Sequence, residues 1–143
     1  MNEHLNGWVP RILSIFRIMY GLLFLEHGTS KILHFPQATN SHALEIFSLG
    51  GISGLLELVG GLLLAIGLFT RPVAFIAAGE MAVAYFMVHA PQGFFPLLNL
   101  GELAILYCFA FLLMAAAGGG SWSVDEYLRS RQEAALTARS ATL

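Results

Sequence analysis

Four long apolar stretches make up most of this chain, and they restrict what it can fold into more than any other feature. A helix needs roughly 20 apolar residues to cross a hydrocarbon layer about 30 Å thick. The stretches are far longer than ordinary strands and lack period-two alternation, which argues against a β-structure. The sequence therefore predicts an all-α integral membrane four-helix bundle. The predicted spans lie at about residues 12–33, 46–69, 72–88 and 97–117.

The composition agrees with a membrane protein and argues against other classes. Hydrophobic residues account for 57% of the chain and charged residues for 11%, with a mean hydropathy of +0.71. A soluble domain usually has about 25% charged residues. The net charge of -2 gives no basic surface for nucleic acid. The single cysteine, Cys108, cannot form an internal disulfide, so a redox role would need a bound cofactor or a partner.

The basic residues predict the orientation of the bundle. Four crossings place both termini and the turn at residues 70–72 on the same side of the membrane. The opposite side has only Lys31, at a helix end. Because cytoplasmic segments carry an excess of Lys and Arg, both termini are expected in the cytoplasm. The arginines on that side are Arg11, Arg71, Arg129, Arg131 and Arg139.

The C-terminal tail carries a helix-start signal. Three glycines at 118–120 end the fourth span, and Ser123 with Glu126 has the spacing of a capping box. A short amphipathic helix through Leu128 and Leu136 would follow. Two alternatives remain open for the tail: it lies along the cytoplasmic interface, or it frays beyond Arg131.

Ionisable residues inside the spans are the candidate functional residues. Each costs roughly 2.5–3.5 kcal/mol on insertion scales, so each needs a partner or a function. Depth along the helices predicts an inner pair, Arg17 with Glu80, and an outer cluster. A helical wheel places Glu26 opposite Arg17. One stripe of the first span holds Arg17, Gly21, Phe24, Gly28 and Lys31, with His27 at its edge; the outer cluster is Glu57, Glu102, His27, Lys31 and His89.

Structural explanations for these charges stay open beside the functional one. Lys31–Glu57 or Arg17–Glu80 could be ion pairs that only lock the bundle, and His89 could be a simple interfacial residue. The glycines of the second span favour close helix packing. No metal site is expected, because the adjacent Glu26 and His27 diverge by about 100° on a helix.

The order and spacing of several motifs resemble the DoxX family of small membrane proteins. The first two are Phe24-Leu-Glu-His-Gly-x-x-Lys31 and Glu57-Leu-x-Gly-Gly-Leu-Leu-Leu. The others are Gly67-Leu-x-Thr-Arg-Pro72, Gly101-Glu102-Leu103 after a loop that starts at His89, and Gly118-Gly-Gly-Ser-Trp-Ser-Val-Asp125. The resemblance covers about residues 10–126, which is nearly the whole chain.

The resemblance implies a DoxX-like four-span domain at residues 1–126 in the bacterial inner (plasma) membrane and a cytoplasmic tail at 127–143. The family takes its name from a subunit of a thiosulfate:quinone oxidoreductase, and other members are linked with oxidative stress. The resemblance also favours an ion pair between Arg17 and Glu57 over one between Arg17 and Glu80. The recurrent polar positions of the family fall on Arg17, His27, Lys31, Glu57, His89, Glu102 and Asp125.

Three functions are compatible with the sequence. In the first, the chain is a quinone-linked redox subunit, in which His27, Lys31, Glu57 and Glu102 hydrogen-bond a quinone and relay protons. In the second, it is a non-catalytic membrane anchor that holds a soluble redox enzyme through the tail. In the third, it transports a small solute or protons, which would require a homo-oligomer because four short helices leave little room for alternating access.

Overall fold

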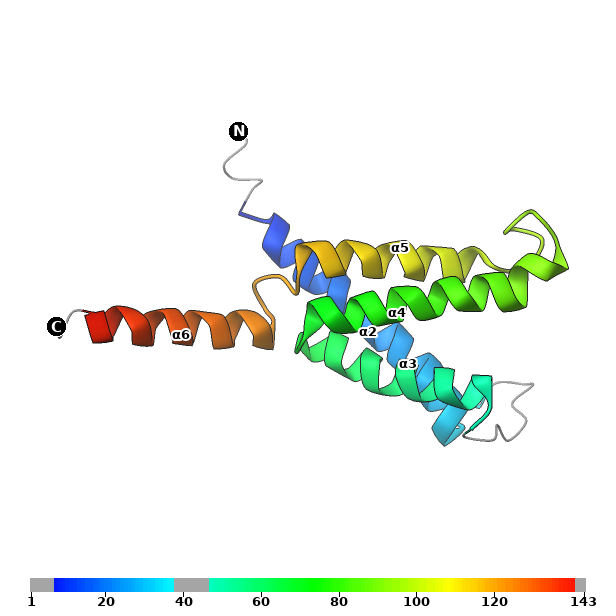
Figure 1. Cartoon of the computed structure of the whole chain (residues 1–143), viewed down its shortest axis with the longest axis horizontal. Coiled ribbons are helices and arrows are strands. Elements are labelled where there is room, and N and C mark those ends of the chain that lie inside the picture. The colour runs from blue at the N-terminus through cyan, green and yellow to red at the C-terminus, as the bar shows by residue number, and fades with distance from the viewer. Residues whose placement is uncertain (1–6, 38–46, 141–143) are drawn as a thin grey trace.

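The computed structural model describes residues 7–37 and 47–140, and that part of the chain is helical, without strands. Figure 1 shows four helices that run alongside one another and a fifth that leaves them at one end. This confirms the all-α prediction. The helices are α2 (Val9–Leu33), α3 (Leu49–Ile66), α4 (Thr70–Ala84), α5 (Glu102–Ala117) and α6 (Val124–Ser140); α4 continues as a π-helix, Tyr85–His89, and a 3-10 turn, Ala90–Gln92.

Local sequence signals explain where the helices begin and end. The hydroxyl of Ser48 accepts a hydrogen bond from the backbone N–H of Gly51 at 3.1 Å and so caps the start of α3. Gly67 ends α3 in the left-handed region with a φ of 74°, which favours glycine. α5 begins at Glu102, later than the predicted 97. The reason is that Asn99, itself buried, turns the chain by accepting from Gly101 N at 2.8 Å.

The four helices α2 to α5 pack as two pairs, α2 with α3 and α4 with α5, and the pairs meet mainly through α3 and α4. The α2–α3 contact is unusually close. A Cβ added to Gly28 would lie 2.2 Å from the backbone nitrogen of Leu58, and one added to Gly61 would lie 2.4 Å from that of Leu25. These two helices therefore touch backbone to backbone, as the sequence predicted for its glycines.

An aromatic core fills the centre between the pairs. The ring of Phe24 on α2 lies 4.8 Å from that of Phe111 on α5, and both are fully buried. Tyr107 also contacts both of these rings. Most other large apolar side chains face outward on all four helices, Leu22, Leu62 and Phe75 among them. An outward apolar surface of this extent suits lipid rather than water.

Two of the helices are long and apolar enough to cross a membrane: α3, and α4 with its extension to Gln92. α5 is apolar but shorter, with 16 residues. α2 is long but carries several charges, Arg17 and Lys31 among them. The crossing of all four helices therefore stays a prediction, although their packing places them side by side.

The tail is helical to Ser140, so fraying beyond Arg131 was the wrong alternative. α6 has no buried residue, and Figure 1 shows it running away from the four helices. The hydroxyl of Ser123 accepts from the N–H of Glu126 at 3.2 Å, which confirms half of the predicted capping box. The Glu126 carboxylate binds Arg129 at 2.6 Å instead of reaching back.

Candidate functional site

Arg17 lies on α2, fully buried, and binds four backbone carbonyls. Its Nε donates to Gly119 O at 2.8 Å and its Nη2 to Trp122 O at 2.8 Å. Its Nη1 donates to Leu64 O at 2.5 Å and Ala65 O at 2.6 Å. We call this arrangement the Arg17 clamp. Both predicted pairings of Arg17, with Glu80 and with Glu57, are absent among the described contacts.

The C-terminal end of α3 provides hydrogen-bond acceptors for the buried guanidinium of Arg17. The last carbonyls of a helix lack intrahelical partners and carry the negative end of its dipole, so they attract a guanidinium. Gly67 leaves the room that the side chain needs, since a Cβ there would lie 2.8 Å from Arg17 Cζ. Asp125 is the carboxylate whose charge acts on Arg17.

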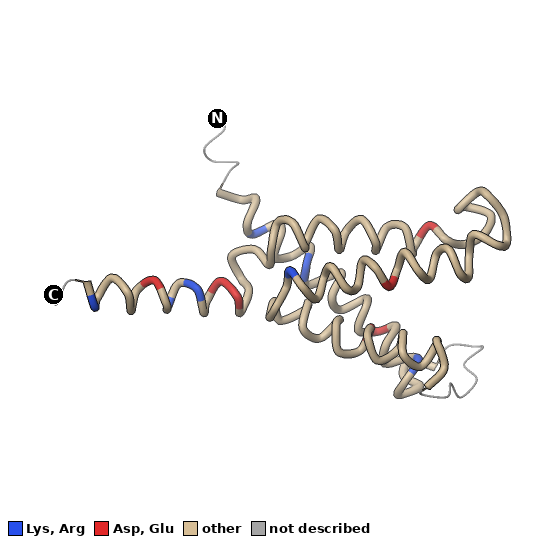
Figure 2. Tube along the Cα trace, viewed as in Figure 1, with Lys and Arg blue, Asp and Glu red and all other residues tan. Residues whose placement is uncertain are grey.

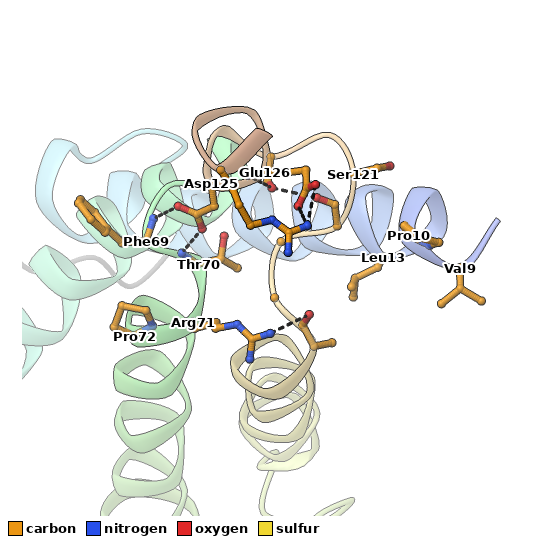
Figure 3. A pocket seen from close by; sticks show the side chains of 16 residues that line it. Val9, Pro10, Leu13, Phe69, Thr70, Arg71, Pro72, Ser121, Asp125 and Glu126 are labelled. Atoms are coloured by element: carbon orange, nitrogen blue, oxygen red, sulfur yellow. Dashed lines mark hydrogen bonds and ion pairs between the residues drawn. The ribbon is translucent and has the colours of Figure 1, made fainter. Parts of the chain in front are cut away.

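Asp125 fixes the base of α6 to the turn between α3 and α4. Its two carboxylate oxygens accept from the N–H groups of Phe69 and Thr70, each at 2.8 Å, and its own N–H donates to Gly67 O at 3.0 Å. Figure 3 shows the two bonds of the carboxylate at the start of α4. Asp125 thus supplies the N-cap that the sequence around α4 lacks.

A second polar group lies away from the Arg17 clamp, and we name it the mid-helix cluster after its acids within α3 and α4; Lys31 joins it from the last turn of α2. The cluster consists of Lys31, Ser53, Glu57 and Glu80. Lys31 Nζ lies 2.7 Å from Glu57 Oε1 and donates to Ser53 Oγ at 3.0 Å. This confirms that Lys31 and Glu57 form an ion pair.

Figure 2 shows most basic positions of the four helices gathered at the end from which α6 leaves, with the acidic ones away from it.

Glu80 belongs to the mid-helix cluster rather than to Arg17. The charges of Glu57 and Lys31 act on it, and the Ser53 hydroxyl lies beside it without meeting hydrogen-bond geometry. α3 and α4 run antiparallel from a short turn, so Glu57 and Glu80, each about ten residues from that turn, sit at the same level, roughly 15 Å away from it. Arg17 is held next to the turn, too far away.

Three carboxylate oxygens of the mid-helix cluster are buried and have no hydrogen-bond partner in the described structure: Oε2 of Glu57 and both oxygens of Glu80. Glu57 is 3% exposed. Buried polar atoms are nearly always paired, and leaving one unpaired costs about 1–3 kcal/mol. The cluster therefore offers acceptors that the fold itself does not use.

An apolar groove between α3 and α4 ends at Glu80. Its volume is about 140 Å³. Leu56 and Ile76, on opposite walls, are exposed on the outer surface of the helices, so the groove opens toward the surroundings. Glu80 is the one ionisable residue among those that line it: Leu56, Val59, Gly60, Leu63, Val73, Ile76, Ala77 and Glu80.

The remaining predicted site residues lie apart from Lys31 and Glu57. His27 is exposed, and its ring meets that of Tyr107 edge-on at 6.0 Å. His89 Nδ1 lies 2.9 Å from Asn99 O, so it helps to hold the loop before α5. Glu102 is exposed in the first turn of α5. Glu26 is exposed too, on the face of α2 away from Arg17, as the helical wheel predicted.

The sequence analysis missed Ser53 and assigned Glu80 to the wrong partner. A signal for Ser53 existed, because it precedes Glu57 by one helical turn and shares its face. Within residues 7–37 and 47–140, no group of three or more His, Cys, Asp and Glu side chains could hold a metal ion.

These features define a small helical protein with an apolar exterior and a partly buried ion pair between two of its helices. The DoxX family model matches residues 12–90, and the chain belongs to the DoxX family of membrane proteins. A protein of Haemophilus influenzae named "Uncharacterized protein" is 41% identical over 127 residues, 86% of this chain and 95% of the relative. The "Inner membrane protein YqjF" of Escherichia coli is 30% identical over 123 residues, 82% of this chain and 92% of the relative. No solved structure matches the chain.

Proposed function

We propose that this chain is the quinone-facing membrane subunit of a redox system, with the quinone ring held at the mid-helix cluster. The observation that carries the proposal is the set of buried carboxylate oxygens without partners on Glu57 and Glu80. They lie near the ammonium group of Lys31, and Glu80 lies at one end of an apolar groove. As acceptors, these oxygens match the hydroxyl groups of the reduced quinol, and the groove matches its hydrocarbon tail.

The residues of the cluster have distinct tasks in this proposal. Glu57 orients Lys31, whose ammonium group has three donors, of which two bind Glu57 and Ser53. The third donor is left for a carbonyl oxygen of the ligand. Two carboxylates and one ammonium leave an excess negative charge in a low-dielectric region, which is costly. We infer that Glu80 carries a proton there and can donate a hydrogen bond.

The quinone would supply the two-electron, two-proton chemistry. A soluble oxidoreductase is the partner class that would supply or accept the electrons, and protons would pass through Glu80 and the Lys31–Glu57 pair. The groove between α3 and α4 keeps water from the tail of the ligand and opens on the apolar exterior. In this proposal the membrane is the bacterial inner membrane, and both termini face the cytoplasm.

The binding of a short-chain benzoquinone to the purified full-length chain in detergent tests the proposal. Glu80→Gln should weaken binding at least about tenfold, which corresponds to about 1.4 kcal/mol. Glu102→Gln is the matched control, because it makes the same change at an exposed position on α5. Equal binding by wild type and Glu80→Gln, or equal loss in both variants, would contradict the proposal.

A second function, anchoring of a soluble redox enzyme, is favoured by α6. This helix is exposed from Tyr127 to Ser140, while its base is fixed through Asp125 and through the Arg17 bond to Trp122 O. An exposed helix with a fixed base is suited to protein docking. Removal of residues 130–143 leaves Ser123, Asp125 and Glu126 in place. It should release a co-purifying redox enzyme, whereas unchanged co-purification would exclude this role.

A further inference from the structure

A large pocket lies at the end of the helices from which α6 leaves, remote from the mid-helix cluster. Its volume is about 790 Å³. Figure 3 shows that its walls come from the start of α2, the turn before α4, the loop after α5 and the first turns of α6. We call it the α6-base pocket. Its polar lining includes Thr70, Arg71, Ser121, Ser123, Asp125, Glu126 and Arg129.

The charged groups that face this pocket leave one cation without a carboxylate. Glu126 neutralises Arg129 at 2.6 Å and raises the pKa of its guanidinium. Asp125 acts on the buried Arg17 and is held by two backbone N–H groups. Arg71 has no ion pair within the described residues. The two arginines and two carboxylates that line the pocket balance in number, and Arg71 is the cation among them without a carboxylate partner.

The hydrogen bonds of Arg71 leave part of its guanidinium free. Nη1 donates to Ala116 O at 2.7 Å and to Ala115 O at 3.3 Å, and Nη2 donates to Ala117 O at 3.4 Å. A guanidinium has five N–H donors, so Nε–H and one N–H of Nη2 remain. The carbonyls at the end of α5 hold the group in place without cancelling its charge. An oriented guanidinium with free donors is well suited to a phosphate.

The rest of the pocket is apolar and lies at the level of interfacial aromatic residues. Val9, Leu13, Phe69 and Pro72 line it, and Val9 and Phe69 are exposed beyond it. Trp8 and Trp122, both exposed, belong to the same end of the molecule. Tryptophans concentrate at the headgroup level of membranes. A ligand in this pocket would thus meet the unpaired cation of Arg71, a polar side at the base of α6 and an apolar wall.

We propose that the α6-base pocket binds a phospholipid, with Arg71 donating hydrogen bonds to its phosphate and with the upper part of an acyl chain against Val9, Leu13 and Pro72. Basic pockets between helices on the cytoplasmic side are a known form of lipid headgroup site. The loop after α5 and the base of α6 form the wall opposite α4. A bound lipid would therefore join α6 to α4 and α5.

Native mass spectrometry of the full-length chain in detergent, titrated with phosphatidylglycerol, tests the proposal. Wild type should retain one lipid, and Arg71→Gln should lower its occupancy at least about tenfold, which is about 1.4 kcal/mol. Arg131→Gln is the matched control, since that cation is exposed on α6 and does not line the pocket. It should keep wild-type occupancy. Arg71→Lys, which keeps the charge, should retain part of the binding if loss in Arg71→Gln reflects the phosphate contact.

Inorganic phosphate separates a lipid site from a general anion site. At equal concentration it should neither bind nor compete with the lipid, because the apolar wall adds nothing to its affinity. Competition by phosphate would overturn the lipid assignment. Full lipid retention by Arg71→Gln, or equal losses in Arg71→Gln and Arg131→Gln, would overturn the site itself.

Discussion

The Arg17 clamp and the mid-helix cluster both bury charge between the same helices, but they satisfy it differently. Arg17 uses four of its donors on backbone carbonyls at the end of α3 and in the loop before α6. The cluster combines Lys31 with Glu57 and Glu80 and leaves three carboxylate oxygens unpaired. One region is complete without a ligand, and the other is not.

Their positions along the helices explain the difference. At a helix end, backbone groups are free to bind a charged side chain. Within a helix they are bound to one another, so the charges of Glu57 and Glu80 depend on other side chains, here on Lys31 in the last turn of α2. Glu57 alone would neutralise Lys31, and Glu80 adds an acid that no structural need explains. We therefore assign stability to the first region, and ligand binding at the second is our proposal.

Removal of Arg17 should have the largest effect on stability. Arg17→Met leaves four carbonyls without their partner and Asp125 without the cation that it faces. Breaking a buried charged interaction costs about 3–5 kcal/mol. Unfolding in mixed micelles, followed by circular dichroism, should show this loss. A loss below about 1 kcal/mol would mean that the clamp does not stabilise the fold.

Gly61→Ala should rank second, because it pushes apart the two helices that both regions share. The added Cβ would lie 2.4 Å from the backbone of Leu25, whereas at Gly60 it would lie 3.7 Å from Phe24. Overpacking costs about 1–3 kcal/mol. The same unfolding measurement should give this loss for Gly61→Ala and almost none for Gly60→Ala. Equal effects would argue against backbone contact between α2 and α3.

Glu57→Gln should destabilise the protein by less, about 1–2 kcal/mol, because Lys31 keeps Ser53 and can bind the amide oxygen. Lys31→Met/Glu57→Gln should recover part of the loss, since it removes both charges together. Thermal unfolding of the single and double variants measures the coupling between the two positions. Strict additivity would show that the ion pair contributes nothing.

Glu80→Gln should have the smallest effect on stability, within about 0.5 kcal/mol of zero or slightly favourable. It removes a carboxyl group whose oxygens have no partner. Glu80→Gln should nevertheless lose most of its quinone binding. The substitution should therefore weaken ligand binding while leaving the free energy of unfolding almost unchanged. A destabilisation as large as that of Arg17→Met would place Glu80 with the structural charges and remove the contrast between the regions.

The apolar runs and a helical wheel predicted much of this fold. They did not predict which groups the charged side chains pair with. The stripe of Arg17, Gly21, Phe24 and Gly28 is buried, as the wheel indicated. The partners of Arg17 are main-chain carbonyls, which every residue has, so no residue type marks them. The partner of Glu80 depends on how α3 and α4 pack at a given level, and counting depth along single helices could not determine it.

The carbonyls that bind Arg17 lie 47, 48, 102 and 105 residues away in the sequence. During synthesis, a chain that has just completed α3 can offer two of them, and the other two follow only when residues 119 and 122 have been made. The Arg17 guanidinium therefore lacks two of its four carbonyl partners until most of the chain has been made. Truncated or misassembled chains would expose this unmet charge, which gives membrane quality control a chemical difference between finished and unfinished molecules.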